Sequence, residues 1–159
     1  MIMGQAEKNN EMEKSSQRVT LNNVSYPPKI ILAWAKAIEG DKGFLKWLNE
    51  NGYKELAMSV FAIYLKDDAR NWLLENGYAH LMAMINAAEG NIPAQKWLLS
   101  NDMMTFFHIA MAVENERKSW DWLKKHCGLE IFILTKSIEK IKDKIDENHN
   151  DIHYFGRDL

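Results

Sequence analysis

Apolar residues recur along this chain at an interval of 25 residues. Four tryptophans, each followed directly by a leucine, occupy equivalent positions: Trp47, Trp72, Trp97 and Trp122. Alanine recurs in the same register at Ala37, Ala62, Ala87 and Ala112. Self-similarity at a fixed period is the mark of a repeat protein. The pattern therefore predicts a series of equivalent structural units.

Two further columns keep the apolar type while the residue itself varies. The first contains Ile31, Leu56, Leu81, Phe106 and Ile131, and the second contains Ile38, Ile63, Ala88, Val113 and Ile138. Since the first column begins before Trp47, half a repeat precedes the first tryptophan. The pattern predicts a leading helix followed by four helical hairpins.

Each copy divides into a short helix and a more apolar one. The short helices are expected at Lys42 to Asn51, Asp68 to Asn76, Pro93 to Asn101 and Lys118 to His126. The apolar helices are expected at Leu56 to Leu65, Leu81 to Ala88 and Phe106 to Val113. Residues 81–85 are apolar on nearly every side of a helix, which indicates burial on several sides.

Several residues suit helix ends. The Asn-Gly pairs at 51–52 and 76–77 are typical of helix C-termini, where glycine adopts the left-handed conformation easily. Asp41, and Asp67 or Asp68, are candidate N-caps. Pro93 suits a first helical turn.

Helices of about ten residues are marginally stable alone in water, so the hairpins must stack. The expected fold is an all-α solenoid of about nine helices, closed by a longer C-terminal helix over Ile131 to Asp146. Residues 1–24 are polar, which predicts a flexible arm. Residues 25–147 are expected to form the helical-repeat domain, and residues 148–159 are expected to form a tail.

One stretch resembles the helical part of an ankyrin repeat. It runs Ala87-Ala88-Glu89-Gly90 and then Trp97-Leu98-Leu99, which is a small-residue helix, a glycine turn and a Leu-Leu helix. Ankyrin units are about 33 residues long and carry a Thr-Pro-Leu-His signature that this chain lacks. The resemblance covers about residues 31–135, and HEAT-like solenoids are a comparable analogy. It implies a repeat protein without the β finger, of a kind that usually binds other proteins.

Composition excludes several classes of function. Lys plus Arg total 20 against 22 for Asp plus Glu, and this balance gives no electrostatic reason to expect nucleic acid or an acidic membrane as a partner. No run of 18 apolar residues could span a bilayer. The N-terminus lacks the apolar run of a signal peptide, and the single Cys127 cannot form an internal disulfide. The expected location is the cytoplasm.

The tryptophan column has two interpretations. It could be an exposed binding stripe, but large aromatic side chains usually bury most of their surface, which favours a core position. On that interpretation, Trp72→Ala would cost about 3–5 kcal/mol of stability.

Candidate chemistry is sparse, and no catalytic, cofactor-binding or metal-binding residue is expected. His149 and His153 have the four-residue spacing of metal ligands, but they lie in a polar segment without a third ligand. His126 and Cys127 are adjacent, a poor arrangement for activating a thiol, and a structural helix end is favoured. His80 is expected to be exposed at a helix start.

His108 falls in an apolar column, which predicts a hydrogen-bonded or half-exposed core histidine. Lysines at positions 124–144 alternate with acidic residues, which is typical of a solvated helix face.

The favoured function is a protein–protein interaction or scaffold module, because a solenoid presents variable positions on a constant frame. The expected partner-contact residues are Lys46, Arg70, Asn71, Gln95, Lys96, Trp120 and Asp121. Trp120 is the preferred anchor, since tryptophan is enriched at binding hot spots. The alternatives are a small ligand-binding or enzymatic domain that uses an inter-helix groove, and a structural subunit of a larger complex.

Overall fold

A computed structural model describes the backbone of residues 25–157 and the side chains of residues 25–148. Over that range the chain forms nine α-helices and no β-strand. The helices are α2 (Pro28–Ile38), α3 (Lys42–Glu50), α4 (Lys54–Ile63), α5 (Asp67–Glu75), α6 (Ala79–Ala88), α7 (Ile92–Ser100), α8 (Met104–Val113), α9 (Arg117–His126) and α10 (Leu129–Arg157). The predicted all-α repeat fold with a longer C-terminal helix is confirmed.

Helix starts agree in part with the predicted caps. The Asp41 carboxylate accepts a hydrogen bond from the backbone N–H of Phe44 at 3.1 Å, so this N-cap is confirmed. Asn91 caps α7 in the same way through the N–H of Ala94. The prediction for Asp67 and Asp68 is wrong: both lie inside the first turn of α5, after an N-cap residue whose side chain forms no cap bond. There they complement the positive end of the helix dipole instead.

The nine helices form two layers. Helices α2, α4, α6, α8 and α10 form the inner layer, while α3, α5, α7 and α9 pack outside it. Each outer helix contacts the inner helix before it and the inner helix after it, and so covers the groove between them. All inner helices run in the same direction. We call the end where they begin the amino end, and the end where α2 to α8 finish the carboxyl end.

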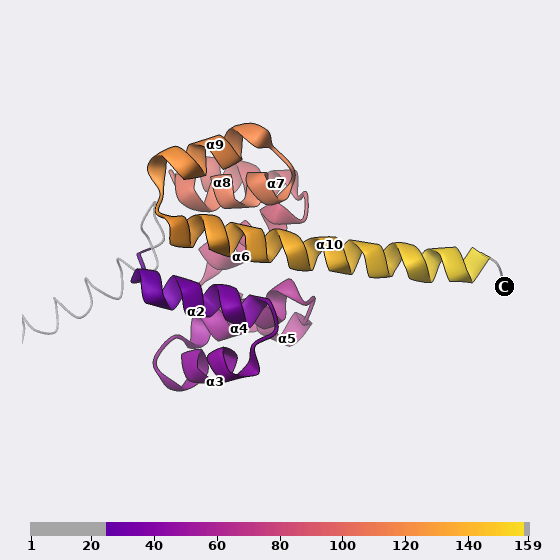
Figure 1. Ribbon diagram of the computed structural model, residues 1–159, viewed down its shortest axis with the longest axis horizontal. Helices are drawn as coiled ribbons and strands as arrows, with labels where there is room; N and C mark the ends of the chain where they lie inside the picture. The colour runs from indigo at the N-terminus through magenta and orange to yellow at the C-terminus, as the bar shows by residue number, and fades with distance from the viewer. Residues whose placement is uncertain (1–24, 158–159) are drawn as a thin grey trace, which may run out of the picture.

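The inner layer closes on itself into a ring. Successive inner helices contact one another, and the first, α2, also packs against the last, α10 (Figure 1). Polar contacts reinforce this closure, since Glu39 at the end of α2 accepts hydrogen bonds from Ser137 and Lys140 of α10, both at 3.1 Å. The two ends of the array therefore cover each other. An open solenoid would need a separate cap at each end.

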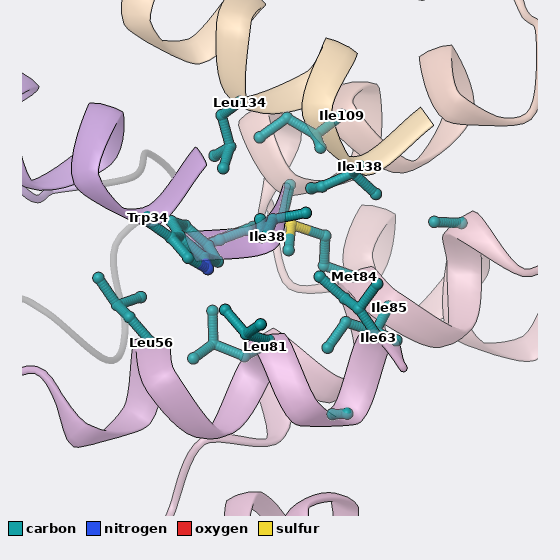
Figure 2. Close-up of a cluster of buried hydrophobic side chains, with 14 of the residues drawn as sticks. Trp34, Ile38, Leu56, Ile63, Leu81, Met84, Ile85, Ile109, Leu134 and Ile138 are labelled. Carbon is teal, nitrogen blue, oxygen red and sulfur yellow. The ribbon is translucent and has the colours of Figure 1, made fainter. Parts of the chain in front are cut away.

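The centre of the ring is a dry core built from one residue of each inner helix. The five residues follow one another at intervals of 25 positions, and each is at most 1% exposed. They are Trp34, Ser59, Met84, Ile109 and Leu134. Figure 2 shows four of them among their neighbours. The indole N–H of Trp34 donates to Ser59 Oγ at 2.9 Å, and Ser59 donates to the Leu56 carbonyl at 2.6 Å. This pairing satisfies the two buried polar side chains. The two apolar columns that begin at Ile31 and Ile38 are also buried.

The expectation that the tryptophan column is core is wrong. The leucine after each tryptophan is completely buried, but Trp47 is 44% exposed, Trp97 is 39% exposed, and the other two are half-buried. Successive residues on a helix differ by about 100° in direction. Leucine therefore points at the inner layer while the tryptophan before it lies on the flank. There Trp47 stacks on Tyr53 and Trp72 stacks on Tyr78.

The last helix is longer than predicted. The expected helix ended at Asp146, but α10 continues to Arg157, so the proposed boundary at residue 148 falls inside a helix. Figure 1 shows the second half of α10 projecting beyond the carboxyl end of the ring. None of the helices in the described part of the chain is long and apolar enough to cross a membrane.

Candidate functional site

The predicted contact residues lie in different environments on the outer helices. Four of them are exposed, one on each outer helix: Lys46, Asn71, Lys96 and Asp121. They share one register position and point away from the ring. Nothing in the described structure engages them beyond a 3.8 Å ion pair between Lys46 and Glu50.

Arg70 and Gln95 have structural contacts instead. Arg70 donates to the Ala62 carbonyl at 2.9 Å and pairs with Glu89 at 2.5 Å. Gln95, one repeat later, donates to the Ala87 carbonyl at 3.1 Å. The last carbonyls of a helix lack partners within the helix. These two side chains satisfy such carbonyls and attach an outer helix to the inner helix before it.

Trp120 is half-buried at the junction of α9 and α10. Its ring meets Phe132 edge to face at 5.1 Å between centroids, and the Lys136 ammonium lies 4.2 Å from the indole centroid. Such cation–π contacts contribute about 0.5–1 kcal/mol when exposed. Trp120 therefore fixes α9 to α10 and keeps part of its surface accessible.

The ring has five inner grooves, yet the described residues supply four outer helices. The groove between α2 and α10 has no helix of residues 25–157 over it. We call this groove the seam and define it by Leu32 of α2 and by Leu129 and Ile133 of α10. All three are exposed, and Leu129 is 72% exposed. Figure 1 shows α2 and α10 side by side at the front of the ring.

Register confirms that Leu32 and Ile133 face this groove. In the inner helices α4 and α6, the residues equivalent to Leu32 are Ala57 and Met82, which are buried. The equivalents of Ile133 include Ala83, also buried, and His108, whose ring stacks on Trp122 of an outer helix. These positions thus face outer helices elsewhere. At the seam, Leu32 and Ile133 are exposed and meet no outer helix of residues 25–157.

The amino end of the ring holds a second cluster, of polar residues. Glu55, His80 and Thr105 occupy one repeat column in the first turns of α4, α6 and α8, and all three are buried. Tyr26 donates to the Glu55 carboxylate at 3.0 Å. The prediction that His80 is exposed is wrong, because closure of the ring turns the first turns of the inner helices toward one another.

His80 is a neutral histidine in an apolar setting. Its ring packs between Tyr78 and Phe106, and its Nε2 atom has no hydrogen-bond partner. Burial lowers the pKa of His80 to about 4. The charged form is disfavoured because no carboxylate compensates for the lost hydration.

Cys127 lines a shallow cavity of about 180 Å³ at the amino end, together with His126, Thr105 and Glu130. Burial raises the pKa of the Cys127 thiol, Glu130 raises it further, and a hydrogen bond with Thr105 opposes the rise. The thiolate is the nucleophilic form, so this environment disfavours nucleophilic chemistry. The ring of His126 packs against Trp122 at 4.6 Å, not against the thiol.

The remaining histidines are His108, His149 and His153. His108 is half-buried, as predicted, with Nδ1 2.9 Å from Ser119 Oγ. The side chains of His149 and His153 lie outside the described residues. Among those that are described, no group of three His, Cys, Asp or Glu residues could hold a metal ion.

A larger cavity of about 380 Å³ opens at the carboxyl end of the ring. Its walls include Ile63 of α4, Ile85 of α6 and Ile138 of α10. Figure 2 shows Ile63 and Ile85 close together at one side of the core, with Ile138 above them. Carboxylates of Glu89 and Glu114 contribute to its rim. Volume and lining are typical of small-molecule sites, which are apolar with a few polar groups.

The fold and these surfaces define a class: an all-α ring of short helical hairpins with one groove that no helix of residues 25–157 covers and a cavity at its carboxyl end. Comparison of the chain with family models, with curated proteins and with solved structures produced no match.

Sequence reasoning missed both the seam and the cavity. The sequence offered one signal for the seam, the apolar column that Leu32 shares with Ala57. That column does not show which groove lacks an outer helix. Both features depend on ring closure, which the repeat pattern does not encode.

Proposed function

We propose that the protein is an interaction module that binds a short amphipathic helix of a partner protein in the seam. The observation that carries the proposal is the uncovered fifth groove of a ring in which the other four grooves each hold an outer helix. Exposed apolar residues that line a groove mark interaction sites more often than scattered ones do.

The outer helices indicate what such a partner would present. Each is nine or ten residues long and places one completely buried leucine in its groove, as Leu73 of α5 and Leu98 of α7 do. A partner helix of similar length with apolar residues at i, i+3 or i+4, and i+7 would cover Leu32 and Ile133 in the same manner. Full burial of such side chains contributes about 1.5–3 kcal/mol each.

Charge around the seam favours an acidic flank on the partner. Lys29 and Lys36 lie on the exposed side of α2 and form no ion pair with another described residue. Lys136 of α10 lies over Trp120, on the side of α10 that faces α9, and pairs with Glu139 at 3.3 Å. Complementary charge mainly increases the rate and specificity of association, so binding should weaken with salt.

Of the residues expected to contact a partner, Trp120 lies on the α9 side of α10 and remains a candidate for a contact beside the seam. Its partly accessible indole borders α10 beside Lys136. The exposed positions Lys46, Asn71, Lys96 and Asp121 remain candidates for a second contact surface. Cytoplasmic location remains part of the proposal, on the sequence argument alone.

A second candidate function, a small ligand-binding domain, is favoured by one observation, the cavity of about 380 Å³ at the carboxyl end. An enzymatic role has no comparable support, because the thiol of Cys127 has a raised pKa and its histidine neighbour packs elsewhere.

Site-specific photo-crosslinking in the full chain tests the seam. A photoreactive residue at position 32 should capture a partner segment from native lysate, whereas one at position 99 should not. Leu32 and Leu99 are matched controls, because they are leucines that are 39% and 42% exposed, one in the seam and one on outer helix α7.

Direct binding of a peptide then tests whether the seam holds a helix. A synthetic peptide of the captured segment should bind the purified protein with about micromolar affinity and become helical. Leu32→Asp should weaken binding at least tenfold, and Leu99→Asp should leave it unchanged. Equal effects of the two substitutions, or a peptide that binds in an extended form, would refute the proposal.

A further inference from the structure

The carboxyl-end cavity combines an apolar interior with a rim that is mostly acidic. Isoleucines from three inner helices, Ile63, Ile85 and Ile138, form its interior, and Ile145 of α10 adds to the wall. Since α10 continues beyond the ring, it forms one side of the opening (Figure 1). Ile63, Ile85 and Ile138 are buried, so most of the apolar area that a ligand could cover belongs to Leu65 and Ile145 at the opening. Covering apolar area is favourable in proportion to the area removed from water.

The charges at the rim are unequal. Glu89, Glu114 and Asp146 contribute three carboxylates, and Lys142 contributes one ammonium. Lys142 is bound to Glu114, and Glu89 is paired with Arg70 at 2.5 Å. Asp146 is exposed and has no ion pair among the described side chains. One carboxylate at the mouth is therefore left without a cation.

Backbone dipoles add to this negative potential. Helices α4, α6 and α8 all end beside the cavity, and a helix C-terminus carries about half a negative charge. A ligand with a positive charge would be attracted to the opening, whereas an anion would be repelled.

Leu65 gives the mouth an unusual shape. It has a φ of 67°, in a position where other repeats have Gly40, Gly90 and Asn115. A side chain with a β-carbon costs about 1–2 kcal/mol in this conformation. Leu65 is nevertheless 46% exposed and lines the cavity. Its side chain extends the apolar wall outward to the entrance.

We propose that this cavity binds a small organic cation, a primary ammonium carried on an aliphatic or aromatic body. The inference rests on the second candidate function and is independent of the seam. The body lies against Leu65 and Ile145, which offer most of the accessible apolar lining, and the ammonium lies at the mouth near the Asp146 carboxylate. Glu114, already bound by Lys142, supplies a weaker second contact.

Three probes of equal chain length test the charge preference on the full-length protein: n-hexylammonium, 1-hexanol and hexanoate. Titration of each, followed by NMR chemical shifts of the cavity methyl groups, should show hexylammonium binding at least tenfold more tightly than hexanol. Hexanoate should bind more weakly than either.

Two single substitutions on α10 provide the matched pair. Asp146→Asn should abolish the preference for hexylammonium over hexanol and leave hexanol binding unchanged. Asp143→Asn, also exposed on α10 but outside the cavity, should alter neither.

The titrations distinguish a cavity that binds ligands from a cavity that prefers a cation. Equal affinities for hexylammonium and hexanol in the wild type would refute the cationic ligand while leaving a ligand-binding cavity in place. No shift of the cavity methyls with any of the three probes at millimolar concentration would refute both.

Discussion

The tryptophans of the inner and outer layers differ sharply in environment. Trp34 lies at the centre of the ring, fully buried, with its N–H bound to Ser59. Trp47 and Trp97 lie on outer helices and keep about two-fifths of their surface exposed. Yet the exposed tryptophans recur in every repeat, whereas Trp34 has no tryptophan equivalent. Recurrence of a residue is therefore not a measure of its burial in this protein.

Ring closure explains the difference. Each outer tryptophan lies on the flank of its hairpin, where its neighbours vary: Trp47 stacks on Tyr53, whereas Trp122 stacks on His108. A half-exposed flank accepts the same residue in every repeat because its packing is not shared among all five inner helices. The centre of the ring is one shared space into which all five inner helices project. Side chains there must complement one another in volume at the packing density of a protein interior. A large Trp34 is accordingly combined with the small Ser59 and with Met84, Ile109 and Leu134.

The largest expected effect follows from truncating the central indole. Trp34→Ala should lower the free energy of unfolding by about 3–5 kcal/mol, through lost burial and the cavity left behind. Urea denaturation followed by circular dichroism measures this change. A loss below about 1 kcal/mol would contradict the central position of Trp34.

A second prediction concerns pH at the amino end of the inner layer. The pKa of His80 is about 4 in the folded state and 6.5 for an unperturbed histidine, so the unfolded state binds more protons between these pH values. Neutral His80 therefore makes its full contribution to the free energy of unfolding above about pH 6.5. This contribution, about 3 kcal/mol, is lost as the pH falls toward about 4.

The His80→Phe variant should remove this dependence, because phenylalanine keeps the ring contacts with Tyr78 and Phe106 without a titrating group. The measurement is the difference in unfolding free energy between wild type and variant at pH 7 and at pH 4. A difference that does not change with pH would contradict the buried, neutral histidine.

In the outer layer, Trp47→Ala should lower the free energy of unfolding by about 1 kcal/mol. The substitution removes the stacking of the indole on Tyr53, but the indole is only partly buried in the wild type. This is well below the 3–5 kcal/mol of a core tryptophan. The adjacent Leu48→Ala, at a fully buried position, is the matched comparison and should cost about 2–5 kcal/mol in the same denaturation experiment. A reversed order of the two costs would restore the tryptophans to the core.

The smallest effect is a gain. Leu65→Gly should stabilise the protein by up to about 1 kcal/mol, because relief of the left-handed strain exceeds the entropy that glycine loses on folding. Thermal denaturation measures the gain. If the variant is less stable than the wild type, the exposed leucine side chain contributes more to packing at the cavity mouth than its conformation costs.

Much of the architecture followed from the sequence, since helix length, order and most ends depend on local patterns. The columns that begin at Ile31 and Ile38 were correctly recognised as apolar faces. Asp41 and Pro93 marked helix starts because capping and proline effects act within a few residues. The burial of His80 was predicted wrongly because it depends on Phe106, 26 positions away. The position of the tryptophans was predicted wrongly because the leucine after each one, and not the indole, points at the inner layer.

By itself, therefore, the sequence determined that helices of about ten residues alternate in hairpins, since periodicity and caps are encoded within each repeat. Only the tertiary structure decided that α2 meets α10, because contacts such as Glu39 with Lys140 join residues about 100 positions apart. That closure buries Glu55, His80 and Thr105 in the first turns of α4, α6 and α8, leaves one groove without an outer helix from residues 25–157, and creates the cavity at the carboxyl end. The candidate sites thus arise from how the repeats meet, and no single repeat contains them.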